Sequence, residues 1–93
     1  MKKDFFVISF ESTHYAMMME KRLKEKFKVD MIPTPRCITA SCGLSLKMDT
    51  GLIEEVILTL KSFDVDKTMF QIYRICKTGQ EDQVTPIDWE DNP

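Results

Sequence analysis

The sequence has few of the residues that mark disulfide-rich, phosphate-binding or membrane-spanning proteins. Its three cysteines are an odd number, so we expect reduced thiols rather than a complete disulfide framework. Its three glycines are isolated and form no loop that would cradle a phosphate. The apolar run at residues 5–10 is too short for a signal peptide or a transmembrane helix. We therefore expect a cytoplasmic protein without a membrane partner.

Basic residues are too few and too dispersed for a nucleic-acid-binding surface. The chain has 13 Lys and Arg residues against 15 Asp and Glu residues, which gives a net charge of -2. All the Lys and Arg residues lie at or before Lys77, and five of the acidic residues follow it. Because a nucleic-acid-binding domain needs a dense basic face, we expect no nucleic-acid partner.

The chain also lacks the residue spacing of a metal centre. Its only histidine is His14, and Cys37 and Cys42 are separated by four residues rather than two. Structural zinc sites use C-x2-C pairs or closely spaced histidines. We therefore expect no metal and no other cofactor.

The apolar patterns that are present fit one small α+β domain. Apolar runs and strict alternation predict strands at residues 5–10, 29–32, 44–48 and 68–75. Apolar residues at every third or fourth position predict amphipathic helices at residues 14–27 and 52–63. This order predicts a ferredoxin-like βαββαβ sandwich, in which two helices cover one face of a four-stranded antiparallel sheet. We expect residues 1–77 to form this domain. Residues 78–93 are expected to form an acidic tail that is loose or lies over the domain through Trp89.

The segment PTPRCITASCG, residues 33–43, is longer than a plain turn needs. In the predicted fold this loop and the start of the first helix lie at the same edge of the sheet. The positive end of a helix, together with Arg36, would favour the thiolate form of Cys42. Gly43 leaves room for a large electrophile, and His14 is a candidate base for Cys42. We assign supporting binding roles to Ser12, Thr13, Thr34, Ser41 and Gly43.

From the residues alone, each cysteine keeps a second interpretation. Cys42 fits either a nucleophile or a small residue at the start of a strand. Cys37 fits either a resolving thiol, which would make a redox switch with Cys42, or a loop residue without a role. Cys76 lies near the end of a predicted strand, where a structural role is expected. Arg36 fits either an anion-binding residue or a solvated loop residue.

Two motifs resemble those of a known family. The first is F-x-S-T-H, here residues 10–14, and the second is P-T-P-R-x-I-[ST]-x-S-C-G, here residues 33–43. They are similar to motifs of small bacterial selenium/sulfur carrier proteins. The resemblance implies that Cys42 is the characteristic cysteine, and it extends to matching motif positions at Pro33, Thr34, Pro35, Arg36, Ser41 and Gly43. Cys37 falls on a variable position and Cys76 lies outside the motif, so neither inherits a role.

The resemblance implies a carrier rather than an enzyme with turnover of its own. Cys42 would hold a persulfide or selenopersulfide between a donor, such as a cysteine desulfurase, and an acceptor enzyme. The alternative from the residues is a non-catalytic module that binds a small ligand or a protein. In that interpretation the domain forms a homodimer through an exposed sheet face that bears Ser45 and Lys47, and Cys42 has no role.

Overall fold

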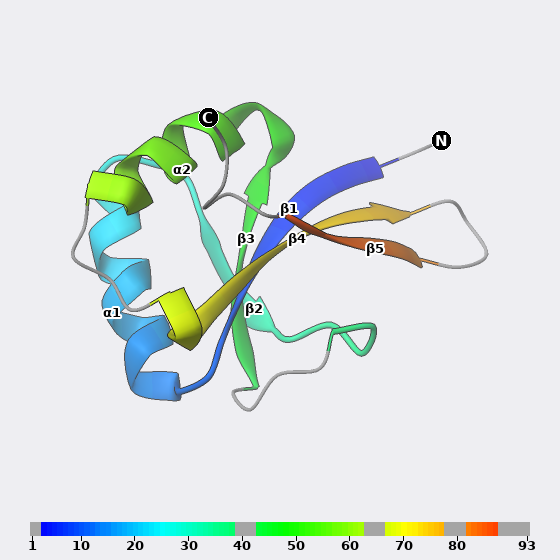
Figure 1. Cartoon of the computed structure of the whole chain (residues 1–93), viewed down its shortest axis with the longest axis horizontal. Helices are drawn as coiled ribbons and strands as arrows, with labels where there is room; N and C mark the ends of the chain where they lie inside the picture. Colours follow the sequence, from blue (N-terminus) through cyan, green and yellow to red (C-terminus); the bar gives the residue numbers. More distant parts are fainter. Residues whose placement is uncertain (1–2, 39–42, 63–66, 78–81, 88–93) are drawn as a thin grey trace.

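The protein, as a computed structural model, is described for residues 3–38, 43–62, 67–77 and 82–87. Within these ranges, two helices pack on one face of a five-stranded antiparallel sheet (Figure 1). The strands are β1 (Lys3–Phe10), β2 (Asp30–Pro33), β3 (Leu44–Asp49), β4 (Phe70–Lys77) and β5 (Asp82–Ile87). The helices are α1 (Thr13–Lys24) and α2 (Ile53–Ser62), and the short 3-10 turns η1 (Thr50–Leu52) and η2 (Lys67–Met69) precede α2 and β4.

Strand β1 lies at the centre of the sheet, whose order is β2-β3-β1-β4-β5. It pairs with β3 on one side and with β4 on the other. All five residues from Phe6 to Phe10 are buried. A strand with buried side chains on both faces needs a continuous apolar run, which explains why this stretch shows little alternation.

The main core lies between the sheet and the helices. Strand β1 points Phe6, Ile8 and Phe10 toward the helices, while α1 contributes Met19 and Leu23. Residues on α2 and on the flanking strands complete the cluster, among them Val56, Leu60, Leu46, Met48 and Ile72. The helix faces predicted from the periodicity are therefore the faces that pack on the sheet.

The prediction of a four-stranded sheet is wrong, because residues 82–87 add a fifth strand. Strand β5 pairs with β4 over the register from Ile72↔Ile87 to Lys77↔Asp82. Val84 packs on one side of the sheet, and Ile87 packs on the helix side. The segment reads as a polar tail because it has few apolar residues and contains Pro86, but a sheet edge tolerates proline.

A second, smaller apolar cluster covers the face of the sheet that the helices leave. It consists of the buried residues Val7, Ile38 and Ile75, with Phe5, Ile32, Tyr73 and Val84 packed around them. The prediction that Ser45 is exposed on this face is wrong, because its exposed fraction is 0%. Lys47 is half-buried and places its ammonium group 4.7 Å from the centre of the Phe5 ring.

Candidate functional site

The loop between β2 and β3 is closed at its neck. The amide of Thr34 donates a hydrogen bond to the carbonyl oxygen of Gly43 at 2.9 Å. This contact continues the strand register, in which Pro33 lies opposite Leu44. Both ends of the loop are therefore fixed at the same edge of the sheet.

A second contact holds the neck through side chains. The hydroxyls of Thr34 and Ser45 are hydrogen-bonded at 2.7 Å. Since Ser45 is fully buried, this contact satisfies a polar group that water does not reach. The structure therefore places the Thr34 hydroxyl against the sheet.

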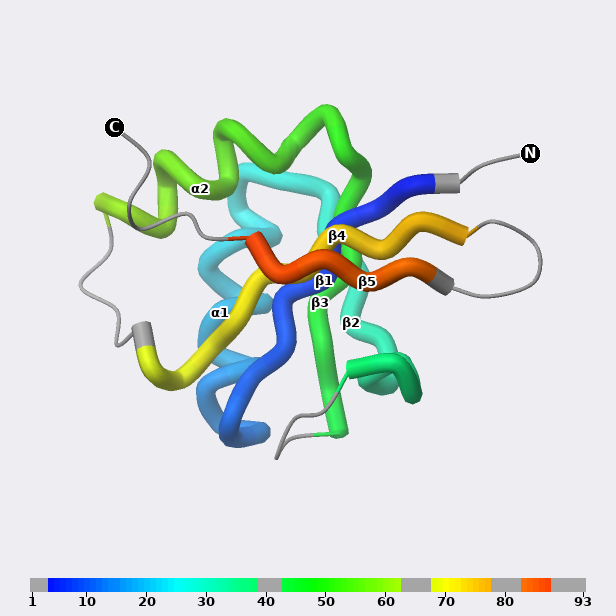
Figure 2. The backbone as a smooth tube through the Cα atoms, turned by 45° about the vertical axis from the view of Figure 1, so that its right-hand side comes forward, coloured from blue at the N-terminus to red at the C-terminus, as the bar shows by residue number. Residues whose placement is uncertain are grey.

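The first half of the loop folds back over the sheet face opposite the helices (Figure 2). The amide of Ile38 donates to the carbonyl oxygen of Pro35 at 3.0 Å, which closes a turn with Arg36 and Cys37 at its tip. Arg36 and Cys37 are exposed, whereas Ile38 is 6% exposed and packs on Val7 and Ile75. Ile38 thus anchors the loop, a role that its place in the second motif did not reveal.

The start of α1 and the start of β3 lie at the same end of the sheet, where β1 ends (Figure 2). The antiparallel register, with Ser9 opposite Ser45, brings the end of β1 beside the start of β3. The chain then enters α1 through Ser12, so the start of the helix and Gly43 share this end. Cys37 is not brought to the helix, because its turn packs on the other side of the sheet.

The residues at the start of α1 divide into a cap and two exposed side chains. The Ser12 hydroxyl accepts a hydrogen bond from the Tyr15 amide at 3.1 Å, so Ser12 is the N-cap of α1. Thr13 and His14 are exposed. The structure assigns the Ser12 oxygen a structural contact, and it leaves the side chains of Thr13 and His14 open to solvent.

Removing this cap is expected to destabilise the protein. Ser12→Ala should lower the free energy of unfolding by about 1 kcal/mol, because the first turn of α1 loses its side-chain acceptor. Urea unfolding followed by circular dichroism measures the change. Ser12→Asp is the matched control, since an aspartate accepts the same bond and favours the positive helix end. An unchanged midpoint for Ser12→Ala would contradict the capping role.

The cysteines are only partly covered by the structure. Cys37 is an exposed thiol and Cys76 a half-buried one, and neither is in a disulfide. Cys42 and Ser41, on which the predicted chemistry depends, lie outside the described residues. The predicted pairing of Cys37 with Cys42 therefore stays a prediction, as does the action of Arg36 and His14 on Cys42.

Two further properties concern only the described part of the chain. Its His, Cys, Asp and Glu side chains form no group of three that would hold a metal ion. Neither α1 nor α2 has the length and apolar composition needed to cross a lipid bilayer.

A model of the protein family described as "Putative Se/S carrier protein-like" matches residues 5–69. The chain belongs to this family. The match to the Se/S carrier-like family covers β1 from Phe5 onward, both helices, β2, the closed loop and β3, and it ends before β4. The resemblance drawn from the two motifs is thus confirmed at the level of the family. No curated protein and no solved structure matches the chain.

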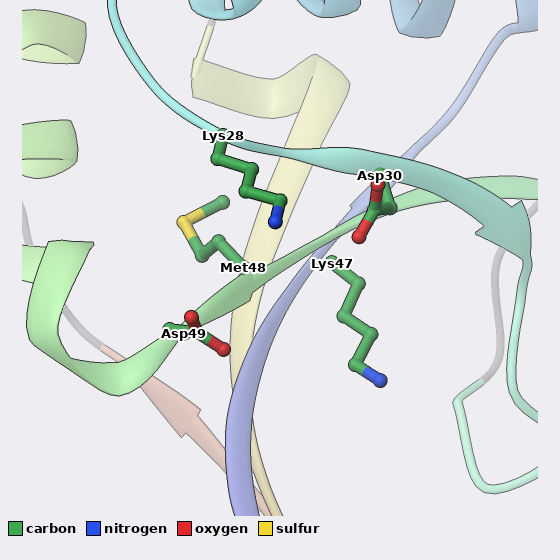
Figure 3. A pocket seen from close by; sticks show the side chains of 5 residues that line it. All are labelled: Lys28, Asp30, Lys47, Met48 and Asp49. Atoms are coloured by element: carbon green, nitrogen blue, oxygen red, sulfur yellow. The ribbon is translucent and has the colours of Figure 1, made fainter.

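A pocket of about 160 Å³ lies at the end of β2 and β3 that is remote from the loop (Figure 3). Its lining contains two lysines, two aspartates and a methionine: Lys28, Asp30, Lys47, Met48 and Asp49. The register places Asp30 opposite Lys47 here, whereas Pro33 lies opposite Leu44 beside the loop. This mixed-charge pocket is therefore separate from the Cys42 loop, although both lie within the segment that the family model matches.

Proposed function

We propose that the protein is a sulfur or selenium carrier and that Cys42 holds the transferred atom. The observation that carries this proposal is the family match over residues 5–69, which contains the whole loop that bears Cys42. The closed neck between Thr34 and Gly43 supports it, because a carrier needs one thiol presented at a defined place to successive partners. The proposal places the protein in the cytoplasm.

The loading step is an exchange at sulfur. The Cys42 thiolate attacks the terminal sulfur of a donor persulfide, R–S–SH. A bond forms between Cys42 and that sulfur, the donor S–S bond breaks, and R–S⁻ leaves. The product is Cys42–S–SH, or Cys42–S–SeH when the donor supplies selenium. An acceptor enzyme then removes the terminal atom and returns the Cys42 thiolate.

The residues around Cys42 have proposed supporting roles. Arg36 is exposed on the turn, where its guanidinium is available to stabilise a thiolate or a terminal chalcogen anion. His14 is exposed at the start of α1 and is the proposed base. Thr13 and Ser41 are proposed to contact the transferred group. The donor is proposed to be an enzyme that forms a protein persulfide, such as a cysteine desulfurase.

Incubation with a persulfide donor tests the proposal directly. The full chain is mixed with a persulfide-forming enzyme and its substrate, desalted without reductant, and analysed by intact-mass and peptide mass spectrometry. We expect one added sulfur atom on the peptide that contains Cys42. Absence of added sulfur, while a known persulfide acceptor in the same mixture is loaded, would sink the proposal.

Gly43 offers a milder test of the approach to Cys42. An added Cβ at this position would meet no atom within 4 Å in the part of the chain that the structure describes. Gly43→Ala should therefore change the free energy of unfolding by less than about 1 kcal/mol. The methyl group beside Cys42 should nevertheless slow persulfide transfer. Urea unfolding and loading rates measured on the same sample separate the two effects, and an unchanged rate would remove Gly43 from the site.

The second candidate function is a binding module, which the mixed-charge pocket favours. Strands β1 to β4 and both helices are then a ferredoxin-like unit to which β5 is added, an arrangement supported by the order β2-β3-β1-β4. A small zwitterion would fit a pocket with two cationic and two anionic side chains. Cys42→Ser distinguishes the candidates, because it should abolish carrier function and leave ligand binding unchanged.

A further inference from the structure

A second pocket, of about 250 Å³, lies where β1 begins, β4 ends and β5 begins. Its lining comes from three neighbouring strands: Asp4 from β1, Arg74 and Cys76 from β4, and Gln83 and Thr85 from β5. The register explains the cluster, because Cys76 lies opposite both Asp4 and Gln83, and Arg74 lies opposite Thr85. Figure 1 shows that this end of the three strands extends away from the helices.

The pocket places a permanent cation beside a thiol. Nη2 of Arg74 donates to Oδ2 of Asp4 at 2.5 Å. This hydrogen bond and the charge of Asp4 raise the pKa of Arg74, and a negative charge on Cys76 raises the pKa further. The same attraction acts between the guanidinium and a Cys76 thiolate, which is the reactive form, whereas the carboxylate of Asp4, which lies opposite Cys76, acts against it.

The guanidinium can still contact a ligand from solvent. The side chain of Arg74 is 52% exposed, and a guanidinium carries five N–H donors, of which the contact with Asp4 takes one from Nη2. Such a fork binds carboxylates well. Gln83 and Thr85 are exposed at the same place and add an amide and a hydroxyl.

This pocket lies outside the part of the chain that defines the family. The family model matches residues 5–69, and every residue that lines the pocket lies before or after that range. Cys76 also lies on β4, whereas Cys42 belongs to the segment between β2 and β3. An inference about Cys76 therefore does not depend on the carrier function proposed for Cys42.

We propose that this pocket is a second thiol site, at which Cys76 reacts with small disulfides that carry a carboxylate bound by Arg74. The Cys76 thiolate attacks one sulfur of R–S–S–R and forms the mixed disulfide Cys76–S–S–R. The S–S bond of the ligand breaks, and the other half leaves as R–S⁻, which takes up the proton that Cys76 released. The disulfide is the oxidant, and no other reactant is needed.

The test compares two probes on the full chain with all its cysteines present. One is 3,3′-dithiodipropionate, which carries carboxylates, and the other is bis(2-hydroxyethyl) disulfide, which is neutral. Rates of mixed-disulfide formation are measured separately at Cys76 and Cys37 by quenched digestion and peptide mass spectrometry. The quantity of interest is the ratio of the two rates at Cys76.

Variants of the ion pair change that ratio in opposite directions. Arg74→Gln should lower the ratio at Cys76 about fivefold, because the probe carboxylate loses one ion pair at the protein surface. Asp4→Asn should raise it, because it removes the anion that competes for the guanidinium. The ratio at Cys37 should be the same in all three proteins, and circular dichroism verifies that each is folded.

Either of two results would overturn the proposal. If the ratio at Cys76 is the same with and without the Arg74 guanidinium, Cys76 is only an accessible thiol. If Asp4→Asn lowers the ratio, Arg74 needs its ion pair for its position and does not recognise the carboxylate. Neither result depends on whether Cys42 can be loaded with sulfur.

Discussion

Cys42→Ser is expected to reduce sulfur loading and transfer to the background level. A serine hydroxyl stays protonated near neutral pH and cannot form the S–S bond in which the transferred atom is held, whereas a thiolate forms it readily. Loading is measured by peptide mass spectrometry after incubation with a persulfide donor. Transfer is measured as sulfide released when a thiol acceptor is added. The free energy of unfolding is measured on the same variant to exclude a folding defect.

Cys37→Ser and Cys76→Ser are the matched controls for this experiment. Cys37 is exposed at the tip of the turn, and Cys76 lies on β4 in a separate pocket. Both variants should keep sulfur loading close to that of the unchanged protein. Loss of transfer in Cys37→Ser as well would show that Cys37 takes part, which is the redox-switch alternative. Loading of Cys42→Ser at the normal level would contradict the carrier proposal.

The sequence predicts those parts of the fold in which one segment determines its own surroundings. The run FFVISF is apolar on both faces, which only a central strand accommodates, and β1 is central. The stripe through Ala16, Met19 and Leu23 has a helical period, and these residues are buried on α1. In both cases the pattern of apolar residues within the segment indicates which of its faces are buried.

The parts of the fold that the sequence does not predict depend on contacts between segments that are distant along the chain. Strand β5 has weak apolar patterning and is a strand because β4 offers it an open edge. Ser45 belongs to an alternating strand and reads as solvent-exposed, but the loop that carries Thr34 folds over it. A periodicity cannot show that another segment covers a polar face.

The candidate site likewise has one feature that the sequence predicts and one that it does not. The position of the α1 start and Gly43 at the same end of the sheet follows from strand direction, which the order of elements already determines. The path of the loop does not follow from that order, because it depends on the packing of Ile38 against Val7 and Ile75 on the sheet face opposite the helices. An apolar residue between polar and proline residues in a loop is the signal that would have indicated an anchor.

Ile38→Ala is expected to have the largest effect of any substitution in the described part of the loop. Ile38 is 6% exposed and packs on two fully buried side chains, Val7 and Ile75. Its truncation should lower the free energy of unfolding by about 2 kcal/mol, at the lower end for a buried isoleucine because the loop can partly collapse. The neck between Thr34 and Gly43 should remain closed, since its hydrogen bond involves only backbone atoms.

The effect of Ile38→Ala should be concentrated in the loop, which hydrogen exchange can measure peptide by peptide. We expect faster exchange across residues 36–42, inside the closed neck, and slower loading of Cys42, because the turn that carries Arg36 loses its anchor. Val56→Ala is the matched control. It creates a defect in the helix-side core, so it should destabilise the whole domain without selectively increasing loop exchange. If the two variants give the same exchange pattern at equal stability, Ile38 contributes only to the core and does not position the loop.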